Sequence, residues 1–409
     1  MFHTSRTVGK SAMAKLSRLP VFSGAMALAV ALSACQAAAP PPGQAPGPAG
    51  QTAPQAAPPI KIGVIMSTTG GLAPFGNDAL PAIEIFAEEA NAKGGINGRK
   101  IELVVVNDES KPELALSGAK KLIQQDKVLV VVGPVSQVVT AAVAPTIEES
   151  KIPNVSCNCI VGPLTPYQFS TFPSKDMMKV QADFIKSHGD NQVGVMAQAG
   201  ALAETLKRFN FPDLEAEGIR IAAFEQFQPT DTDLTPVLAR LRSQGIKHVY
   251  VGASGTQAAL AAKNFKQINY PGYYWTFAGN ANQSYVDLLG EAMDVVNMAG
   301  TKILLYKKLP DSDPAKKRLT EFATKYNAKT KREPGTYAAF FYDSMTSMAD
   351  AIAKGGDSPD KIRDALENQK GLQLLNGTLS RSKDEHNGLT PDWLNIGVDP
   401  ATKEFVVKK

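Results

Sequence analysis

Two loops that follow predicted buried strands carry the residues best suited to bind a ligand. Residues 128–132 are all apolar and predict a strand buried on both faces, and residues 152–156 predict a second strand. Between them, Ser136 is a candidate N-cap of a helix whose apolar residues repeat every four positions. In such a right-handed unit the loops 133–137 and 156–160 end side by side at the carboxyl edge of one parallel sheet. Open α/β sheets bind ligands at that edge, although both loops could also be ordinary tight connections.

The sequence contains no pattern typical of an enzyme. The motifs G-x-S-x-G and H-E-x-x-H are absent, as is an isolated Cys–His pair, and the scattered acids form no pair that can be placed at one site. The loop 67–77 is rich in glycine, but it has neither a G-x-G-x-x-G nor a Walker pattern, so we expect no dinucleotide cofactor. We therefore expect a protein that is not an enzyme and has no cofactor.

The cysteines and histidines do not predict a metal site. Cys157 and Cys159 would point the same way in an extended strand, which leaves a strained disulfide or two free thiols lining a loop. A metal would need two further ligands. The histidines are distant from these cysteines in the sequence, and we expect two of them, His188 and His248, to face the solvent.

Alternating strands and helices predict the α/β class with two doubly wound parallel sheets. A first series begins with a strand at residues 60–66, and a second series of similar size starts near residue 192. Ser110 and Glu113 match a capping box, and residues 301–304 predict a further strand. Two such series imply two lobes with a cleft between them.

The first 59 residues have the composition of an export signal and a tether. A basic segment precedes an apolar run that is short for a membrane span, and this run ends in Leu32-Ser33-Ala34-Cys35, which resembles a bacterial lipobox. We expect residues 1–34 to be removed as a lipoprotein signal peptide and Cys35 to carry the lipid. Residues 35–59 contain no charge and many Ala and Pro residues, so they predict an extended tether.

The charge balance argues against a nucleic-acid-binding protein. Lys and Arg total 43, and Asp and Glu total 39. Four of the basic residues lie within residues 1–34, where there is no acid, so the remainder carries equal numbers of both signs. A nucleic-acid surface needs a basic patch, which this balance does not favour.

From residue 60 to residue 409 the sequence resembles the substrate-binding proteins of the leucine/isoleucine/valine type, which have the type I periplasmic-binding-protein fold. The most specific matching run is Gly-Gly-Ile-Asn-Gly at residues 94–98. Shorter matching pieces include Thr69-Gly70, Phe75-Gly76, Val132-Gly133-Pro134, Tyr337-Ala338-Ala339, Tyr342-Asp343 and residues 384–389.

The resemblance implies a two-lobed protein that delivers a small molecule to an ABC permease from the periplasmic side of a membrane. Ligand binding would close the hinge between the lobes, because the ligand contacts both lobes only in the closed state. The chain would cross between the lobes near residues 178, 302 and 376. The N-terminal lobe would then comprise residues 60–178 and 303–376, and the C-terminal lobe residues 179–302 and 377–409.

The resemblance also implies the binding residues. A substrate carboxylate would meet backbone amides and hydroxyls of the loops after the third and fourth strands, near a helix N-terminus. An aromatic ring would pack on the substrate, a tyrosine would follow the strand that ends at residue 251, and an acid would pair with the ammonium group. The corresponding positions here are Phe75, Ser136, Gln137, Asn158, Cys159, Ile160, Ser254 and Asn280.

Departures from the family pattern change the expected ligand. Gln137 and Ile160 replace hydroxyl residues, and Asn280 replaces the acid. Burying an ammonium group without a carboxylate partner costs several kcal/mol. We therefore expect an amino-acid-like or related solute without a cation: a carboxylate, an amide or an aromatic compound. The alternative is a lipoprotein of the same fold that does not transport but senses a ligand or regulates cell-wall synthesis.

Overall fold

The computed structural model describes residues 57–157 and 165–408, and residues 56–409 form one compact unit. The first sheet has five parallel strands in the order β2-β1-β3-β4-β5. Its strands are β1 (Ile60–Met66), β2 (Ile101–Asn107), β3 (Val130–Val132), β4 (Asn154–Ser156) and β5 (Gln168–Ser170). Strands β3, β4 and β5 are buried along their whole length, as expected for a parallel sheet covered on both faces.

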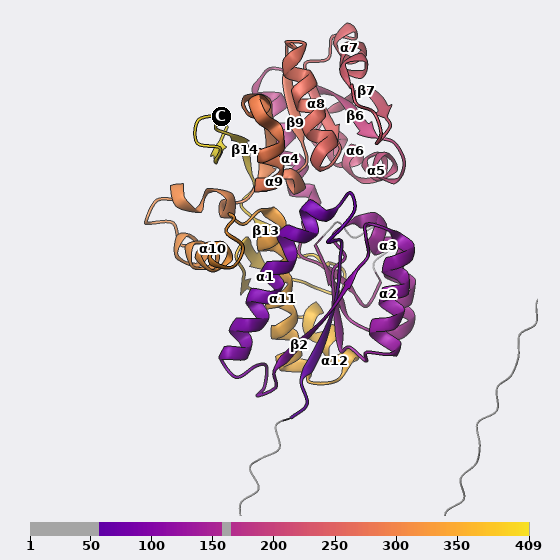
Figure 1. The fold of residues 1–409 in the computed structure, drawn as a ribbon, viewed down its shortest axis with the longest axis vertical. Coiled ribbons are helices and arrows are strands. Elements are labelled where there is room, and N and C mark those ends of the chain that lie inside the picture. Colours follow the sequence, from indigo (N-terminus) through magenta and orange to yellow (C-terminus); the bar gives the residue numbers. More distant parts are fainter. Residues whose placement is uncertain (1–56, 158–164, 409) are drawn as a thin grey trace, which may run out of the picture. The chain divides into compact units, whose positions relative to one another are not determined.

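Helices cover both faces of the first sheet (Figure 1). Helices α1 (Ala73–Ala92) and α11 (Thr336–Gly355) lie on one face, and α2 (Pro112–Gln124) and α3 (Gln137–Ser150) lie on the other. Successive side chains of β1 alternate between the two faces: Val64 belongs to the core formed with α1 and α11, and Ile65 to the core formed with α2 and α3. This is the doubly wound arrangement that the sequence predicts.

The second sheet has seven strands in the order β15-β14-β10-β9-β8-β6-β7. Its strands are β6 (Gln192–Gln198), β7 (Arg220–Phe227), β8 (His248–Gly252), β9 (Tyr273–Thr276), β10 (Val296–Gly300), β14 (Leu394–Val398) and β15 (Phe405–Val407). Strands β6 to β10 are parallel, whereas β14 and β15 join the sheet by antiparallel pairing. The fold class expected from the sequence is confirmed, with two antiparallel strands added at one edge of the second sheet.

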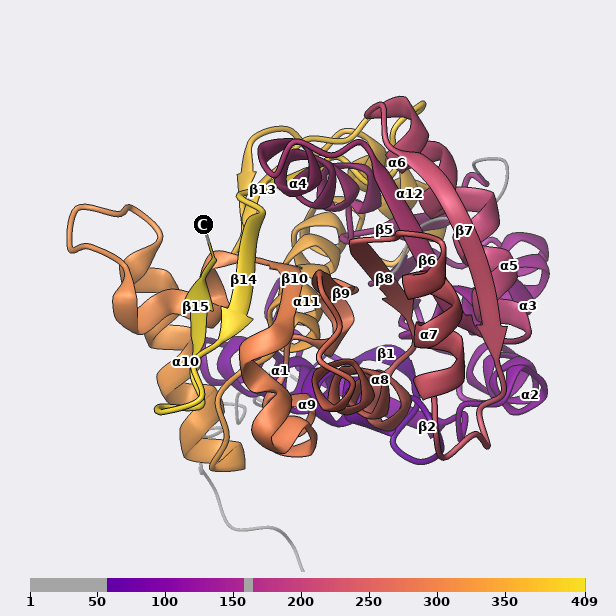
Figure 2. The ribbon, with the colours of Figure 1, turned by 90° about the horizontal axis from the view of Figure 1, so that it is seen from above.

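Figure 2 shows α4 (Ser174–Ser187) and α6 (Phe211–Ala216) on one side of the second sheet and α8 (Gly255–Gln267) and α9 (Gln283–Leu289) on the other. Side chains of β6 alternate in the same way as those of β1. Val195 packs in the core on the α4 side, and Met196 packs in the opposite core, which α7 (Thr235–Ser243) also joins. The shorter helical segments near this sheet are α5 (Ala201–Thr205), η1 (Leu206–Asn210), η2 (Ala278–Asn280) and η3 (Gly290–Val295).

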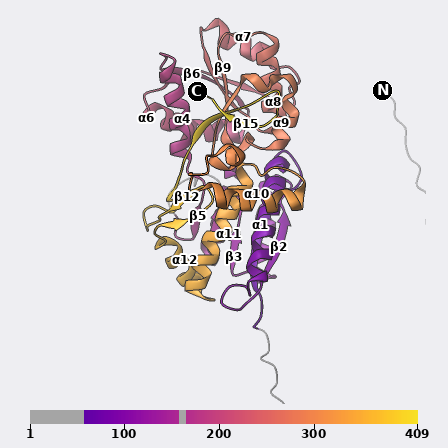
Figure 3. The same ribbon diagram turned by 90° about the vertical axis from the view of Figure 1, so that its left-hand side faces the viewer.

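The remaining elements pack mainly beside the first sheet. They are η4 (Lys302–Lys308), α10 (Lys316–Thr330), α12 (Pro359–Glu367) and a small antiparallel sheet of β11 (Leu372–Gln373), β12 (Gly377–Leu379) and β13 (Leu389–Pro391). Figure 3 shows α10 beside α1. The hydroxyl of Tyr326 in α10 donates to the backbone oxygen of Asp78 in α1, at 2.9 Å. The carboxylate of Asp78 accepts hydrogen bonds from the backbone N–H groups of Gly335 and Ala338 at the start of α11, and burial raises its pKa to about 6.

One turn of α11 is bonded to chain segments that connect the two large sheets. The Thr171 hydroxyl, just after β5, donates to the backbone oxygen of Phe340 at 3.1 Å. The Asp343 carboxylate accepts hydrogen bonds from the backbone N–H and the side-chain amide of Asn376, at 3.1 and 2.8 Å. Thr301, which follows β10, donates to the Asn376 side-chain oxygen at 2.6 Å. This network ties three segments, far apart in the sequence, to one turn.

Several local predictions can be compared directly with the structure. Ser136 is the N-cap of α3 and accepts from the Val139 N–H, which confirms its predicted role. The capping box at Ser110 is wrong, because the Ser110 hydroxyl donates to the Thr69 backbone oxygen and leaves Lys111 as an N-cap without a side-chain bond. The strand predicted at residues 301–304 is also wrong, since these residues enter the 3₁₀ segment η4.

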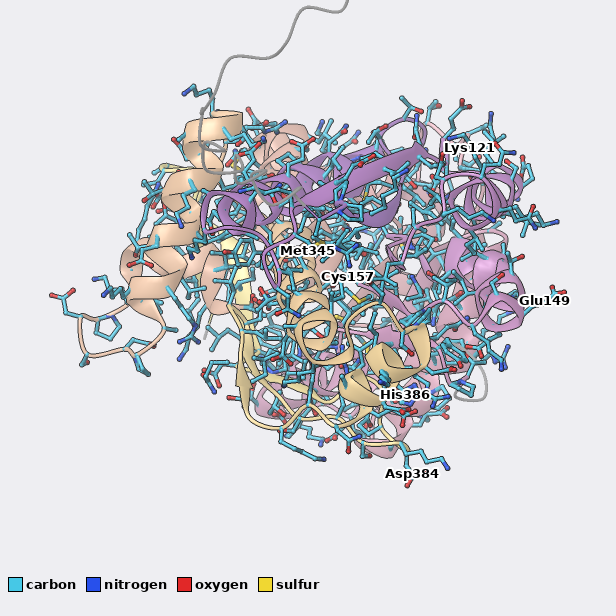
Figure 4. The ribbon with its side chains drawn as sticks, turned by 90° about the horizontal axis from the view of Figure 1, so that it is seen from below. Lys121, Glu149, Cys157, Met345, Asp384 and His386 are labelled. Carbon is cyan, nitrogen blue, oxygen red and sulfur yellow. The ribbon has the colours of Figure 1, made fainter. Side chains whose placement is uncertain are left out.

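One of the two histidines expected to face the solvent is buried. His188 is exposed, as predicted, but His248 is almost fully buried because it begins the central strand β8. His386, labelled in Figure 4, stacks on Phe169 with ring centres 4.3 Å apart, and one ring nitrogen is 2.8 Å from the Gln168 backbone oxygen.

The described residues cover the body of the protein but not its front end. Cys157 and Met345, also labelled in Figure 4, belong to one buried core. Cys159, Cys35 and the rest of residues 1–56 lie outside the described residues, so the thiol and lipidation predictions stay predictions. The lobe boundaries near residues 178, 302 and 376 stay predictions too. No helix in the described ranges is both long and apolar enough to cross a membrane.

Candidate functional site

A cavity of about 340 Å³ lies where loops of both large sheets meet. Its first-sheet side is formed by the start of α1, the start of α2 and residues 135–139 after β3. Its second-sheet side is formed by residues that follow β6 and by Gly252 and Ser254 at the end of β8. These are carboxyl ends of parallel strands, where the sequence places its ligand-binding loops.

Aromatic rings form one wall of the cavity. The Phe75 ring stacks on Tyr337, with centres 5.0 Å apart and an interplanar angle of 24°, and meets Phe277 edge-on at 5.7 Å. Tyr337 in turn stacks on Phe172 at 6.3 Å. All four rings line the cavity, so this wall suits an apolar or aromatic part of a ligand.

The start of α3 provides a polar wall. Ser136 and Gln137 both line the cavity, and Ser136 caps the helix. The side-chain nitrogen of Gln137 is buried and has no hydrogen-bond partner among the described residues. A buried donor without a partner costs about 1–3 kcal/mol, so an acceptor atom of a ligand or a water would stabilise this arrangement. The helix N-terminus also favours a negatively charged group.

Ser254 lines the cavity, but Asn280 does not belong to its lining. The Asn280 side chain is fully buried, and both its amide nitrogen and its oxygen are hydrogen-bonded within the protein. It donates to the Ala253 backbone oxygen at 2.9 Å and to the Thr276 hydroxyl at 2.7 Å, and it accepts from the Gly255 N–H at 3.0 Å. Asn280 therefore holds the residues on both sides of Ser254 in place.

The structure thus brings Phe75, Ser136, Gln137 and Ser254 together around one cavity, with Asn280 behind Ser254. Asn158, Cys159 and Ile160 lie outside the described residues. The role of each of these residues in binding stays a prediction.

Sequence reasoning missed the wall contributed by residues after β6. Thr205, Leu206 and Asn210 line the cavity, and they come from a helix that contains the π-helical turn η1. The one local signal was Pro212, two residues after the end of this turn. Proline lacks an N–H and clashes with the carbonyl four residues earlier, so a regular α-helix cannot run through this point undisturbed.

The cavity carries no charged side chain among the described residues that line it. Its polar side chains carry hydroxyls or amides, and they are Ser110, Ser136, Gln137, Gln198, Thr205, Asn210, Tyr250, Ser254 and Tyr337. Within the described ranges, no group of three or more His, Cys, Asp or Glu residues is arranged to hold a metal ion. The arrangement can therefore bind a small molecule by stacking and neutral hydrogen bonds.

Comparison with known proteins gives one family match. The model of the family described as "Periplasmic binding protein" matches residues 59–394. A "Leucine-, isoleucine-, valine-, threonine-, and alanine-binding protein" of Pseudomonas aeruginosa is 25% identical over 314 residues, which cover 75% of this chain and 82% of that protein. A "Leu/Ile/Val-binding protein homolog 3" of Brucella melitensis is 24% identical, over 79% of this chain and 87% of that protein.

Solved structures show the same fold. An extracellular ligand-binding receptor from Rhodopseudomonas palustris HaA2 superposes with a TM-score of 0.77 at 23% identity, over 86% of this chain and 99% of that chain. The branched-chain amino acid transporter substrate binding protein LivJ from Streptococcus pneumoniae, in complex with isoleucine, superposes with a TM-score of 0.73 at 23% identity, over 86% of this chain and 100% of that chain. At these identities the likeness supports the fold and not the ligand.

Proposed function

This chain belongs to the periplasmic binding protein family, and from that premise we propose that it is the lipid-anchored substrate-binding protein of an ABC importer. It would capture a small solute outside the cytoplasm by closure of its two lobes and deliver it to the permease. The name of the Pseudomonas aeruginosa relative, a leucine-, isoleucine-, valine-, threonine- and alanine-binding protein, supports an amino-acid-like ligand.

The observation that carries the choice of ligand is the absence of charge among the described residues lining the cavity. The α-ammonium group of an amino acid would need a carboxylate partner there, because an unpaired buried charge costs several kcal/mol. Asn280, at the position where the family pattern has an acid, is neutral and its amide is engaged with the loop around Ser254. We therefore propose a ligand without a cation: a carboxylate, an amide or an aromatic compound.

The two walls suggest how such a ligand lies in the cavity. Its apolar part would pack on Phe75 and Tyr337, where ring stacking adds to the area buried. A carboxylate or carbonyl oxygen would accept a hydrogen bond from the Gln137 side chain and from N–H groups at the start of α3. These contacts need no positively charged side chain.

A pair of compounds that differ only in the charged group tests this proposal. Calorimetric titration would compare L-leucine with 4-methyl-2-oxopentanoate, in which a carbonyl replaces the amine, within a wider panel of amides and aromatic carboxylates. We expect a compound without a cation to bind and to raise the melting temperature by mass action, and L-leucine to bind much more weakly than its 2-oxo acid. Micromolar binding of L-leucine would contradict the proposed ligand class.

The transport and anchoring parts of the proposal have their own tests. Labelling cells with a radioactive fatty acid should label the protein. Cys35→Ala should abolish the label and release the protein from the membrane fraction, whereas Cys157→Ala should keep the label.

Deleting the permease should abolish uptake of the identified solute. If no compound of the panel stabilises the protein while an envelope synthase co-purifies with it, a regulatory lipoprotein is favoured instead.

A further inference from the structure

The π-helical turn η1 changes which residues of its helix can face the cavity. In a regular α-helix, residues five positions apart point about 140° away from each other. The N–H of Phe211 bonds to the backbone oxygen of Leu206, a spacing of five, which places residues five apart on one face of the turn. Thr205 and Asn210 have this spacing, and both line the cavity.

The turn is held in its position by close packing. A Cβ atom at Gly252 would lie 2.1 Å from the Leu206 Cδ1 atom, so the first residue of the turn rests directly on the end of β8. Leu206 is buried, whereas Lys207 and Arg208 on the outer face are exposed. The orientation of Thr205 and Asn210 is therefore fixed by the sheet and does not depend on a flexible loop.

The polar atoms of these two side chains are largely unused. The Asn210 amide nitrogen donates to the Met178 sulfur at 3.3 Å, and a thioether is a weak acceptor. Among the described residues, neither the Asn210 side-chain oxygen nor the Thr205 hydroxyl has a hydrogen-bond partner. This differs from Ser110, whose hydroxyl both donates to Thr69 and accepts from the Leu72 N–H.

We propose that Thr205 and Asn210, presented by the π-helical turn, are specificity-determining residues that bind a neutral polar group on the ligand. This inference rests on the proposed function and makes it narrower. The start of α3 would bind a carboxylate, and the aromatic wall would pack on the body of the ligand. Thr205 and Asn210 would then bind a hydroxyl or amide group elsewhere on the same ligand. The Thr205 hydroxyl and the Asn210 amide can each donate and accept a hydrogen bond, so they suit a neutral polar group better than a charged one.

Two aromatic acids serve as probes because they differ by one hydroxyl group. Calorimetry on the purified full-length protein would measure 4-hydroxyphenylacetate and phenylacetate. We expect the wild type to bind the hydroxylated acid at least tenfold more tightly. Asn210→Ala should bring the two affinities within about threefold of each other, and the isosteric Thr205→Val should reduce the ratio as well, because the hydroxyl group loses its partner.

Arg208→Gln is the matched control, since Arg208 lies in the same turn, is exposed and does not line the cavity. This variant should keep the wild-type ratio, and melting curves of all three variants would show that they fold. The inference is overturned if the wild type does not distinguish the acids, if neither acid binds, or if both cavity variants keep the full ratio. The proposed function fails in a different way, when no compound of the wider panel stabilises the wild type.

Discussion

Replacing Asn280 would separate residues that touch a ligand from residues that position them. Its amide makes three hydrogen bonds of 2.7–3.0 Å, all buried, with residues on both sides of Ser254 and with Thr276. Asn280→Ala leaves the Gly255 N–H and the Ala253 oxygen without these partners, and each such buried group costs about 1–3 kcal/mol. We expect a loss of about 3 kcal/mol in the free energy of unfolding.

The same substitution should weaken ligand binding although Asn280 does not line the cavity. Once released, Ser254 must be ordered again when the ligand binds, and fixing the backbone of one residue costs about 1–2 kcal/mol. This corresponds to an affinity about tenfold lower. Asn280→Asp should be at least as destabilising as Asn280→Ala and should not create an amino-acid site, since a carboxylate would face the Ala253 oxygen that the amide now donates to.

Asn282 offers a matched control two residues further along the chain. It is also buried, donates to the Gly279 oxygen at 3.0 Å and caps α9 by accepting from the Tyr285 N–H. Asn282→Ala should cost about 1–3 kcal/mol, because the Gly279 oxygen loses its donor and α9 loses its cap, and should leave affinity unchanged. Urea denaturation and calorimetry, with whichever panel compound binds most tightly, would measure both quantities. The positioning role would be refuted if Asn280→Ala bound the ligand as tightly as the wild type, or if Asn280→Ala and Asn282→Ala lost affinity equally.

Three further predictions follow from the cavity walls and from a buried carboxyl. Gly252→Ala should push Leu206 into the cavity and weaken binding of bulky ligands more than small ones, which a titration series of ligand sizes would show. Phe75→Leu should keep the fold and lower the affinity for an aromatic ligand several-fold, since ring stacking contributes about 1 kcal/mol, while an aliphatic ligand serves as control. Burial raises the pKa of Asp343 from 3.8 to about 7, so the folded state retains a proton that the unfolded state loses, and this carboxyl makes stability fall as pH rises from about 4 to 7. Asp343→Asn should reduce the fall in the free energy of unfolding between about pH 4 and pH 7, measured by denaturation at several pH values. The same fall in the variant and the wild type would contradict this prediction.

The sequence predicts well those parts of the site that local patterns determine. Buried strands followed by polar loops indicated the carboxyl edge of the first sheet, and Ser136 was recognised as an N-cap because its helix has a clear apolar repeat. The resemblance to a known family then gave Phe75 and Ser254 as candidate ligand contacts, and the structure has both residues in the lining of one cavity between the two sheets.

The rest of the site depends on contacts between residues far apart in the sequence. Tyr337 reaches the cavity from α11, more than 250 residues after Phe75, and nothing local indicates that their rings stack. The Asn280 amide was expected to face a ligand, but the loop around Ser254 supplies its partners, which only the packed structure shows. His248 was assigned to the surface because its position at the start of a central strand could not be known.

The turn of α11 that contains Phe340 and Asp343 has a mechanical consequence. Thr171 and Asn376 are hydrogen-bonded to this turn, and Thr301 is linked to it through Asn376. The three chain segments that contain these residues connect the two large sheets, so none of them can bend independently of the others. Rotation of one sheet against the other should then follow a single axis near this turn. Displacements would grow with distance from that axis, and a pair of probes at remote positions would report closure as one concerted movement.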